Sequence, residues 1–192
     1  MPETTPILTA GVYLRYRDAF VFQCGPNPKT GQLALVRVGG HVDPGETVEA
    51  AAVREALEET GCRVTLLHSP STYQWDPAGD ASPSEITDQE PRYVVKPVLR
   101  MGHNAMFWAV TDDVPRLASE TQGLVLLTAA DIARLADGQA TYGDFTAWGG
   151  RCLSRSPYEA QLPIQPFPQF RFLAWLLHNN PQLAANVFVS AN

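Results

Sequence analysis

Cysteine is scarce in this chain of 192 residues, and the three present, Cys24, Cys62 and Cys152, lie far apart. Their odd number and wide spacing give neither a disulfide framework nor the paired spacing of a zinc finger. A chain of this length can bury about 70% of the surface that its unfolded form exposes, so it needs no disulfide or structural metal to fold. The default expectation is a single domain over residues 1–192, with one elaboration.

Long apolar runs are also lacking. No stretch of 18 apolar residues occurs, so no transmembrane helix is predicted. Residues 1–5 have neither the basic start nor the apolar stretch of a signal peptide. We therefore expect a cytoplasmic protein that does not bind membranes.

Positive charge is in deficit, since 14 Lys and Arg residues face 20 Asp and Glu residues and give a net charge of −6. This balance argues against non-specific binding to nucleic acid or to anionic membranes. Hydrophobic residues make up 45% of the chain, which is typical of a globular protein rather than a disordered one. An acidic protein that handles phosphates would need a cation to mediate.

Runs of β-forming residues alternate with turn residues along much of the chain. The pattern predicts strands at residues 7–16, 20–23, 32–38, 63–67, 93–99, 105–111 and 123–127. Helices are predicted at residues 47–60, 129–136 and 170–178. Residues 69–92 carry four prolines and predict a long loop, which in a compact domain is usually functional or disordered. Residues 137–169 show no clean period.

The helix at residues 47–60 carries an acidic face. Glu55, Glu58 and Glu59 fall within an arc of about 100° at 3.6 residues per turn. The predicted core face lies on the opposite side and consists of Ala50, Val53 and Leu57.

Like charges three or four positions apart destabilise a helix by about 0.2–0.5 kcal/mol per pair. Arg54 can offset one of the three charges through Glu58, but a hard divalent cation such as Mg²⁺ or Mn²⁺ would neutralise all of them. A solvated acidic face is the alternative for a generic Glu-rich helix.

The whole segment at residues 40–62, GHVDPGETVEAAAVREALEETGC, resembles the signature of the Nudix hydrolase family, G-x5-E-x7-R-E-U-x-E-E-x-G-U, in which U is apolar. The matching residues are Gly40, Glu46, Arg54, Glu55, Ala56, Glu58, Glu59, Gly61 and Cys62. Two apolar slots are small, at Ala56 and Cys62. Val38 stands before Gly39-Gly40 where many relatives have proline, and we expect an adjusted loop there rather than lost function.

The resemblance implies an α/β (α+β) fold, a Nudix-type α/β/α sandwich around a central mixed sheet. By strand order it extends over a core of about residues 6–136. Residues 137–192 would form a C-terminal helical extension, about which the resemblance says little.

The resemblance also implies a site. The cation ligands would be Glu55, Glu58, Glu59 and the carbonyl of Gly40, and the cation would be Mg²⁺ or Mn²⁺. Glu46 and Arg54 would pair in a supporting role. The reaction would be attack of water on a phosphorus atom of a diphosphate linkage. Its substrate would be a nucleoside diphosphate derivative: a nucleotide sugar, ADP-ribose, a dinucleoside polyphosphate or a nucleoside triphosphate.

One carboxylate must also accept a proton. Within the signature Glu58 or Glu55 can do so, and the family places its base variably. Outside it the candidates are Glu90, Asp88 and Glu120, for which a solvated loop residue is the simpler interpretation.

Three further residues are predicted to contact the substrate. His41 follows the glycines, Trp75 in the long loop can stack on a nucleobase, and Glu90 lies in the same loop. Arg15, Arg37 and Arg92 could each meet a substrate phosphate, although a surface arginine is the default interpretation.

Two other functions share this fold. One is a non-catalytic domain that senses a nucleotide, against which the intact signature argues. The other is an isoprenoid isomerase, whose additional Cys and Glu residues are not found. The oligomeric state stays open, and a homodimer is the expected possibility.

Overall fold

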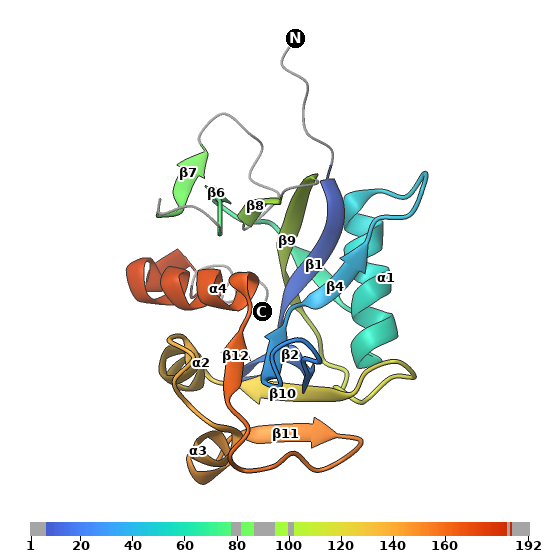
Figure 1. The fold of residues 1–192 in the computed structure, drawn as a ribbon. Coiled ribbons are helices and arrows are strands. Elements are labelled where there is room, and N and C mark those ends of the chain that lie inside the picture. Colours follow the sequence, from blue (N-terminus) through green and yellow to red (C-terminus); the bar gives the residue numbers. More distant parts are fainter. Residues whose placement is uncertain (1–6, 78–81, 87–94, 100–101, 184, 186–192) are drawn as a thin grey trace.

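The computed structural model describes residues 7–77, 82–86, 95–99, 102–183 and 185 (Figure 1). In these residues twelve strands form one mixed sheet. The strands are β1 (Ile7–Tyr16), β2 (Ala19–Pro26), β3 (Leu33–Val36), β4 (Val38–His41), β5 (Thr65–Leu67), β6 (Thr72–Trp75), β7 (Ser84–Ile86), β8 (Val95–Leu99), β9 (Gly102–Val110), β10 (Gly123–Leu127), β11 (Arg151–Ser154) and β12 (Ile164–Pro166).

The helices of the described residues lie on both sides of this sheet. They are α1 (Val48–Thr60), α2 (Ala129–Leu135), α3 (Tyr142–Ala147) and α4 (Pro168–Asn179). In Figure 1, α1 lies on one side of β1 and β4, and α4 lies on the other. The predicted layered fold with a mixed sheet is therefore confirmed. None of the helices in the described ranges has the length and apolar character needed to cross a membrane.

Strand β1 is the centre of the sheet. It pairs parallel with β9 and antiparallel with both β2 and β4. Because successive side chains of a strand point to opposite faces, Val12 and Leu14 face α1, whereas Tyr13 faces α4. The sheet thus carries two separate apolar layers, one on each face.

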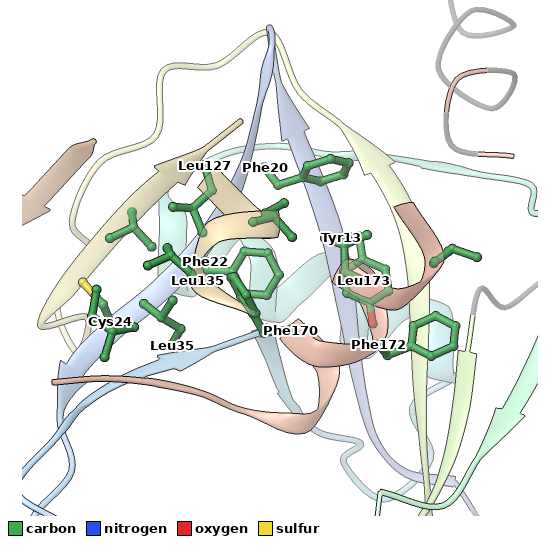
Figure 2. Packing of buried hydrophobic residues seen from close by; sticks show 14 of the residues in the cluster. Tyr13, Phe20, Phe22, Cys24, Leu35, Leu127, Leu135, Phe170, Phe172 and Leu173 are labelled. Atoms are coloured by element: carbon green, nitrogen blue, oxygen red, sulfur yellow. The ribbon is translucent and has the colours of Figure 1, made fainter. Parts of the chain in front are cut away.

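The layer on the α4 side is rich in aromatic residues (Figure 2). Phe170 of α4 packs edge-on against Phe22, with ring centroids 5.1 Å apart. The Tyr13 hydroxyl donates a hydrogen bond of 2.9 Å to the carbonyl of Gln169. The C-terminal helix predicted at residues 170–178 is therefore part of the packed core rather than an appendage.

Both segments that the sequence left irregular contain regular structure. The predicted loop at residues 69–92 includes β6 and β7, and residues 137–169 include α3, β11 and β12. These strands have three or four residues each, too few to show a period. Their partners are also distant, since β11 pairs with β10 and β12 with β3. The C-terminal extension therefore contributes strands as well as a helix.

Helix α1 begins and ends where the sequence predicts. The Thr47 hydroxyl accepts a hydrogen bond of 3.1 Å from the amide of Ala50, and Gly61 ends the helix at φ 67°. The predicted core face, however, is wrong. Val53 and Leu57 are 37% and 47% exposed. The buried side chains are Ala51, Ala52, Ala56 and Thr60.

The small buried residues explain the rotation of α1. Alanine side chains let the helix axis come close to β1 and β4, which bulkier side chains would prevent. At 100° per residue, Glu55 and Glu59 fall within the arc that Ala51, Ala52 and Ala56 define. Both carboxylates therefore start from the face of α1 that lies against the sheet, whereas Glu58 lies at the edge of this face.

This packing gives a testable expectation for stability. Ala52→Leu should lower the free energy of unfolding by about 1–3 kcal/mol, because Ala52 is fully buried and the added atoms must push α1 from the sheet. Urea unfolding measures the change. The control is Leu57→Ala, which removes a half-exposed side chain and should change the free energy of unfolding by about 0.5 kcal/mol or less. A larger loss for Leu57→Ala than for Ala52→Leu would contradict the observed orientation.

Candidate active site

Two consecutive glycines of β4 lie next to α1. Gly39 pairs with Gly11 of β1, and Gly40 pairs with Ala10. Gly39 has φ 145°, and a Cβ atom on it would lie only 2.3 Å from the carbonyl oxygen of Ala10. A Cβ atom on Gly40 would lie 2.4 Å from the carboxylate of Glu55. The absence of side chains at Gly39 and Gly40 is thus what allows the α1 carboxylates to reach the backbone of β4.

Glu59 is a partly buried carboxylate beside these glycines. Its Oε2 accepts a hydrogen bond of 2.7 Å from the amide of Gly39. Burial raises the pKa of Glu59 to about 7, and the negative charge of Glu55 contributes to the rise, while the hydrogen bonds from Gly39 and from the Gln23 side chain oppose it. Glu55 and Glu59 therefore share one partly desolvated region beside the glycines.

Arg54 connects the loop before α1 to the helix. Its Nε and Nη2 donate hydrogen bonds of 3.0 Å each to the two carboxylate oxygens of Glu46. Its Nη1 donates to Glu55 at 2.8 Å and to Glu58 at 3.0 Å. The hydrogen bonds from Arg54 are the main reason that the pKa of Glu46 is lowered. A single guanidinium thus hydrogen-bonds three carboxylates, although its one positive charge balances only one of them.

The three α1 carboxylates do not converge on one point. Among the residues that the structure describes, no three His, Cys, Asp or Glu side chains are placed to hold a metal ion together. The reason is visible in the contacts, because Arg54 binds Glu55 and Glu58 while Glu59 turns to Gly39. The donor chemistry nevertheless fits a hard divalent cation, since Glu55 and Glu59 present carboxylate oxygens and the charge of Glu55 helps to raise the pKa of Glu59.

The predicted substrate contacts are dispersed. His41 is exposed at the end of β4, and its carbonyl accepts a hydrogen bond of 2.9 Å from Arg54. Trp75 of β6 packs on Phe172 of α4, with ring centroids 6.1 Å apart. Glu90, like Asp88 and Arg92, lies outside the described residues. Glu120 is exposed in the segment before β10.

Two more polar residues lie beside the glycines: Gln23, which the sequence did not indicate, and Arg37, which it gave only as one of three arginines that could meet a phosphate. Gln23 of β2 hydrogen-bonds the Glu59 carboxylate, and its Nε2 also donates to the carbonyl of Arg37 at 3.2 Å. Arg37 itself is largely buried rather than on the surface. The sequence did contain one indication for Arg37, because it directly precedes Val38-Gly39-Gly40 and must therefore lie close to the glycines.

A mixed sheet between helices, with Gly39 and Gly40 of β4 beside the Glu-rich helix α1, agrees with the fold that the signature implies. The model of the NUDIX domain matches residues 5–148. The chain therefore belongs to the Nudix family.

Comparisons with individual proteins add detail to this assignment. A protein of Bacillus subtilis (strain 168) named "Putative 8-oxo-dGTP diphosphatase" is 58% identical over 36 residues, which are 19% of this chain and 24% of that protein. The match thus spans about a quarter of the relative's length.

Solved structures resemble this chain at low identity, over different shares of its length. A nudix hydrolase family member from Chromobacterium violaceum has a TM-score of 0.52 at 13% identity, covering 100% of this chain and 91% of that one. A NUDIX family hydrolase from Clostridium perfringens has a TM-score of 0.47 at 18% identity, over 66% of this chain and 84% of its own. The first of these similarities supports the fold.

Proposed function

We propose that this Nudix hydrolase is a divalent-cation-dependent pyrophosphohydrolase that cleaves a diphosphate linkage in a nucleoside diphosphate derivative. The observation that carries the proposal is the position of Glu55 and Glu59 on the sheet-facing side of α1. The carboxylate of Glu55 lies close to Gly40, and the carboxylate of Glu59 accepts a hydrogen bond from the amide of Gly39. Carboxylate oxygens next to the main chain of Gly39 and Gly40 provide the oxygen ligands that a hard divalent cation prefers.

The residues that would hold Mg²⁺ or Mn²⁺ are Glu55, Glu58, Glu59 and the carbonyl of Gly40. When bound, the cation offsets charge on the phosphate oxygens and lowers the pKa of a coordinated water. Arg54 already binds Glu55 and Glu58 through Nη1, so its guanidinium competes for two of these carboxylates. Glu46 limits this competition because it binds the other nitrogens of Arg54.

The proton of the attacking water is assigned to Glu58 or Glu55. Glu58 has the more exposed side chain, at 58% against 15% for Glu55, and so has freedom to move between Arg54 and a substrate water. His41, Trp75 and Glu90 are proposed to contact the rest of the substrate. A cytoplasmic location and a homodimer stay predictions from the sequence.

Trp75 offers a separate test of substrate recognition. Trp75→Ala should raise KM for a nucleotide substrate about threefold to tenfold, because an aromatic stacking partner is lost. The matched control is Trp148→Ala. Trp148 is also partly exposed, but it lies at the end of α3, where its ring packs against Arg134. Steady-state kinetics with each substrate class measures the effect. An unchanged KM across all classes would show that Trp75 only packs on Phe172.

The proposed function is tested by a hydrolysis screen with and without Mg²⁺ or Mn²⁺. The panel contains nucleotide sugars, ADP-ribose, dinucleoside polyphosphates and nucleoside triphosphates, with 8-oxo-dGTP among the last. We expect turnover of at least one class, dependent on the cation and abolished by EDTA. Binding of a panel member without turnover would instead identify a nucleotide-sensing domain. Turnover that EDTA does not affect would contradict the metal requirement.

A further inference from the structure

Arg37 crosses the sheet face opposite α1. It lies between β3 and β4, and its side chain runs over Gly11 of β1. A Cβ atom on Gly11 would lie 3.1 Å from both Cδ and Nε of Arg37. Position 11 shares its face of β1 with Tyr13, which packs towards α4. The guanidinium therefore lies on the α4 side of the sheet, and Gly11 is the residue that leaves space for it.

A buried amide holds the guanidinium in place. The Asn104 side chain is fully buried in β9, and its carbonyl oxygen accepts hydrogen bonds from Arg37 Nε at 3.1 Å and Nη2 at 3.2 Å. The Thr9 hydroxyl lies 2.7 Å from the same oxygen. This amide orientation is the one consistent with the contacts, because the amide nitrogen would face two further donors of Arg37. Two of the three guanidinium nitrogens are thus fixed by a neutral acceptor.

Among the residues that the structure describes, Arg37 forms no direct ion pair. Within the described residues no carboxylate lies within 4.0 Å of its nitrogens. Burial lowers the pKa of Arg37, and the nearby charges of Glu59 and Glu55 oppose this shift. A buried cation is costly unless it is paired. Its electrostatic compensation comes from the two carboxylates that stand on the other side of the glycines.

Those carboxylates are the proposed cation ligands. When they hold a cation, they would compensate the positive charge of Arg37 less. An anionic oxygen near Arg37 would then restore the compensation of its charge. Guanidinium suits this role because its planar set of donors matches phosphate oxygens. We propose that Arg37 binds a phosphate oxygen of the substrate's diphosphate from the α4 side of the sheet, with Asn104 as the residue that positions it. The inference rests on the proposed function for the identity of the substrate.

The test is a binding measurement that does not require turnover. Isothermal titration calorimetry with inorganic pyrophosphate and saturating Mg²⁺ compares the parent protein with Arg37→Gln and Arg37→Lys. We expect Kd to rise about tenfold to a hundredfold for Arg37→Gln, since a charge-assisted hydrogen bond is lost. Arg37→Lys should give a smaller rise, because it keeps the charge but not the planar donors.

The control removes the same charge elsewhere. Arg151 is exposed and pairs with Asp18 at 3.3 Å, on β11 away from the glycines. Arg151→Gln should leave Kd for pyrophosphate unchanged. Equal weakening by Arg151→Gln and Arg37→Gln would reduce the effect to net charge and overturn the assignment. Parent-like binding by Arg37→Gln, or no binding of pyrophosphate by the parent protein, would overturn it as well.

A variant that does not fold and a failure of the proposed function give results that differ from a failure of this inference. If thermal melting shows that Arg37→Gln does not fold, Arg37→Lys decides, and an unchanged Kd for that variant overturns the assignment. Failure of the proposed function is recognised differently, as pyrophosphate binding that depends on Arg37 in a protein that hydrolyses no member of the panel. Hydrolysis by the parent together with Kd values that do not depend on Arg37 would refute this inference alone.

Discussion

Glu59→Gln is expected to lower kcat about a thousandfold while the fold stays intact. Glutamine keeps an oxygen that can accept a hydrogen bond from the Gly39 amide, so this local hydrogen bond is retained. It loses the negative charge that a cation ligand requires, and the charge stabilisation supplied by such a cation is worth several kcal/mol. Each 1.36 kcal/mol changes the rate tenfold. The measurement is kcat at saturating Mg²⁺ with the best substrate of the screen.

Thermal melting and a matched variant accompany this measurement. Burial disfavours the charged form of Glu59, so a neutral glutamine should not lower the melting temperature. Glu49→Gln makes the same change of charge in the first turn of α1, and kcat should stay within about twofold of the parent value. Parent-like turnover of Glu59→Gln would remove Glu59 from the proposed cation ligands.

The ends of α1 were predictable because the interactions that set them are local. Thr47 caps its own helix within three residues, and Gly61 adopts the left-handed conformation that ends it. Strand β1 was likewise predicted with its observed limits, from a continuous run of β-forming residues. Such features depend on neighbours in sequence.

The orientation of α1 was not predictable in this way. Hydrophobicity favoured Val53 and Leu57 for the core, but the partner surface decides which side is buried. That surface is β4, whose Gly39 and Gly40 admit a helix face made of alanines and carboxylates. A pattern of apolar residues carries no information about how closely two backbones approach.

Arg37 illustrates the same limit in the site. From sequence it was one of three arginines that could meet a phosphate. Its place is set by Gly11 and Asn104, which come from β1 and β9 and meet Arg37 only in the folded sheet. The sequence could place the acidic candidates near one another because one helix carries Glu55, Glu58 and Glu59, whereas the position of Arg37 depends on two strands from other parts of the chain.

The two glycines of β4 should separate function from stability. Gly40→Ala is expected to lower kcat/KM at least a hundredfold with a melting temperature close to that of the parent. The added Cβ would lie 2.4–2.5 Å from the carboxylate atoms of Glu55, which end a flexible side chain and can move away. Moving this carboxylate displaces a proposed cation ligand, and small displacements of a catalytic group cost about a hundredfold in rate. Kinetics and thermal melting of the same preparation measure both quantities.

Gly39→Ala should, in contrast, mainly lower stability. A Cβ atom there would meet backbone of β1, at 2.3 Å from the Ala10 oxygen and 2.4 Å from the Gly11 Cα, and neither atom can move without shifting the strand. The φ of 145° adds strain of about 1–3 kcal/mol. We therefore expect Gly39→Ala to lose stability in urea unfolding, by more than this strain alone. If Gly40→Ala instead lost as much stability as Gly39→Ala, Glu55 would be fixed by packing and unable to move as a cation ligand must.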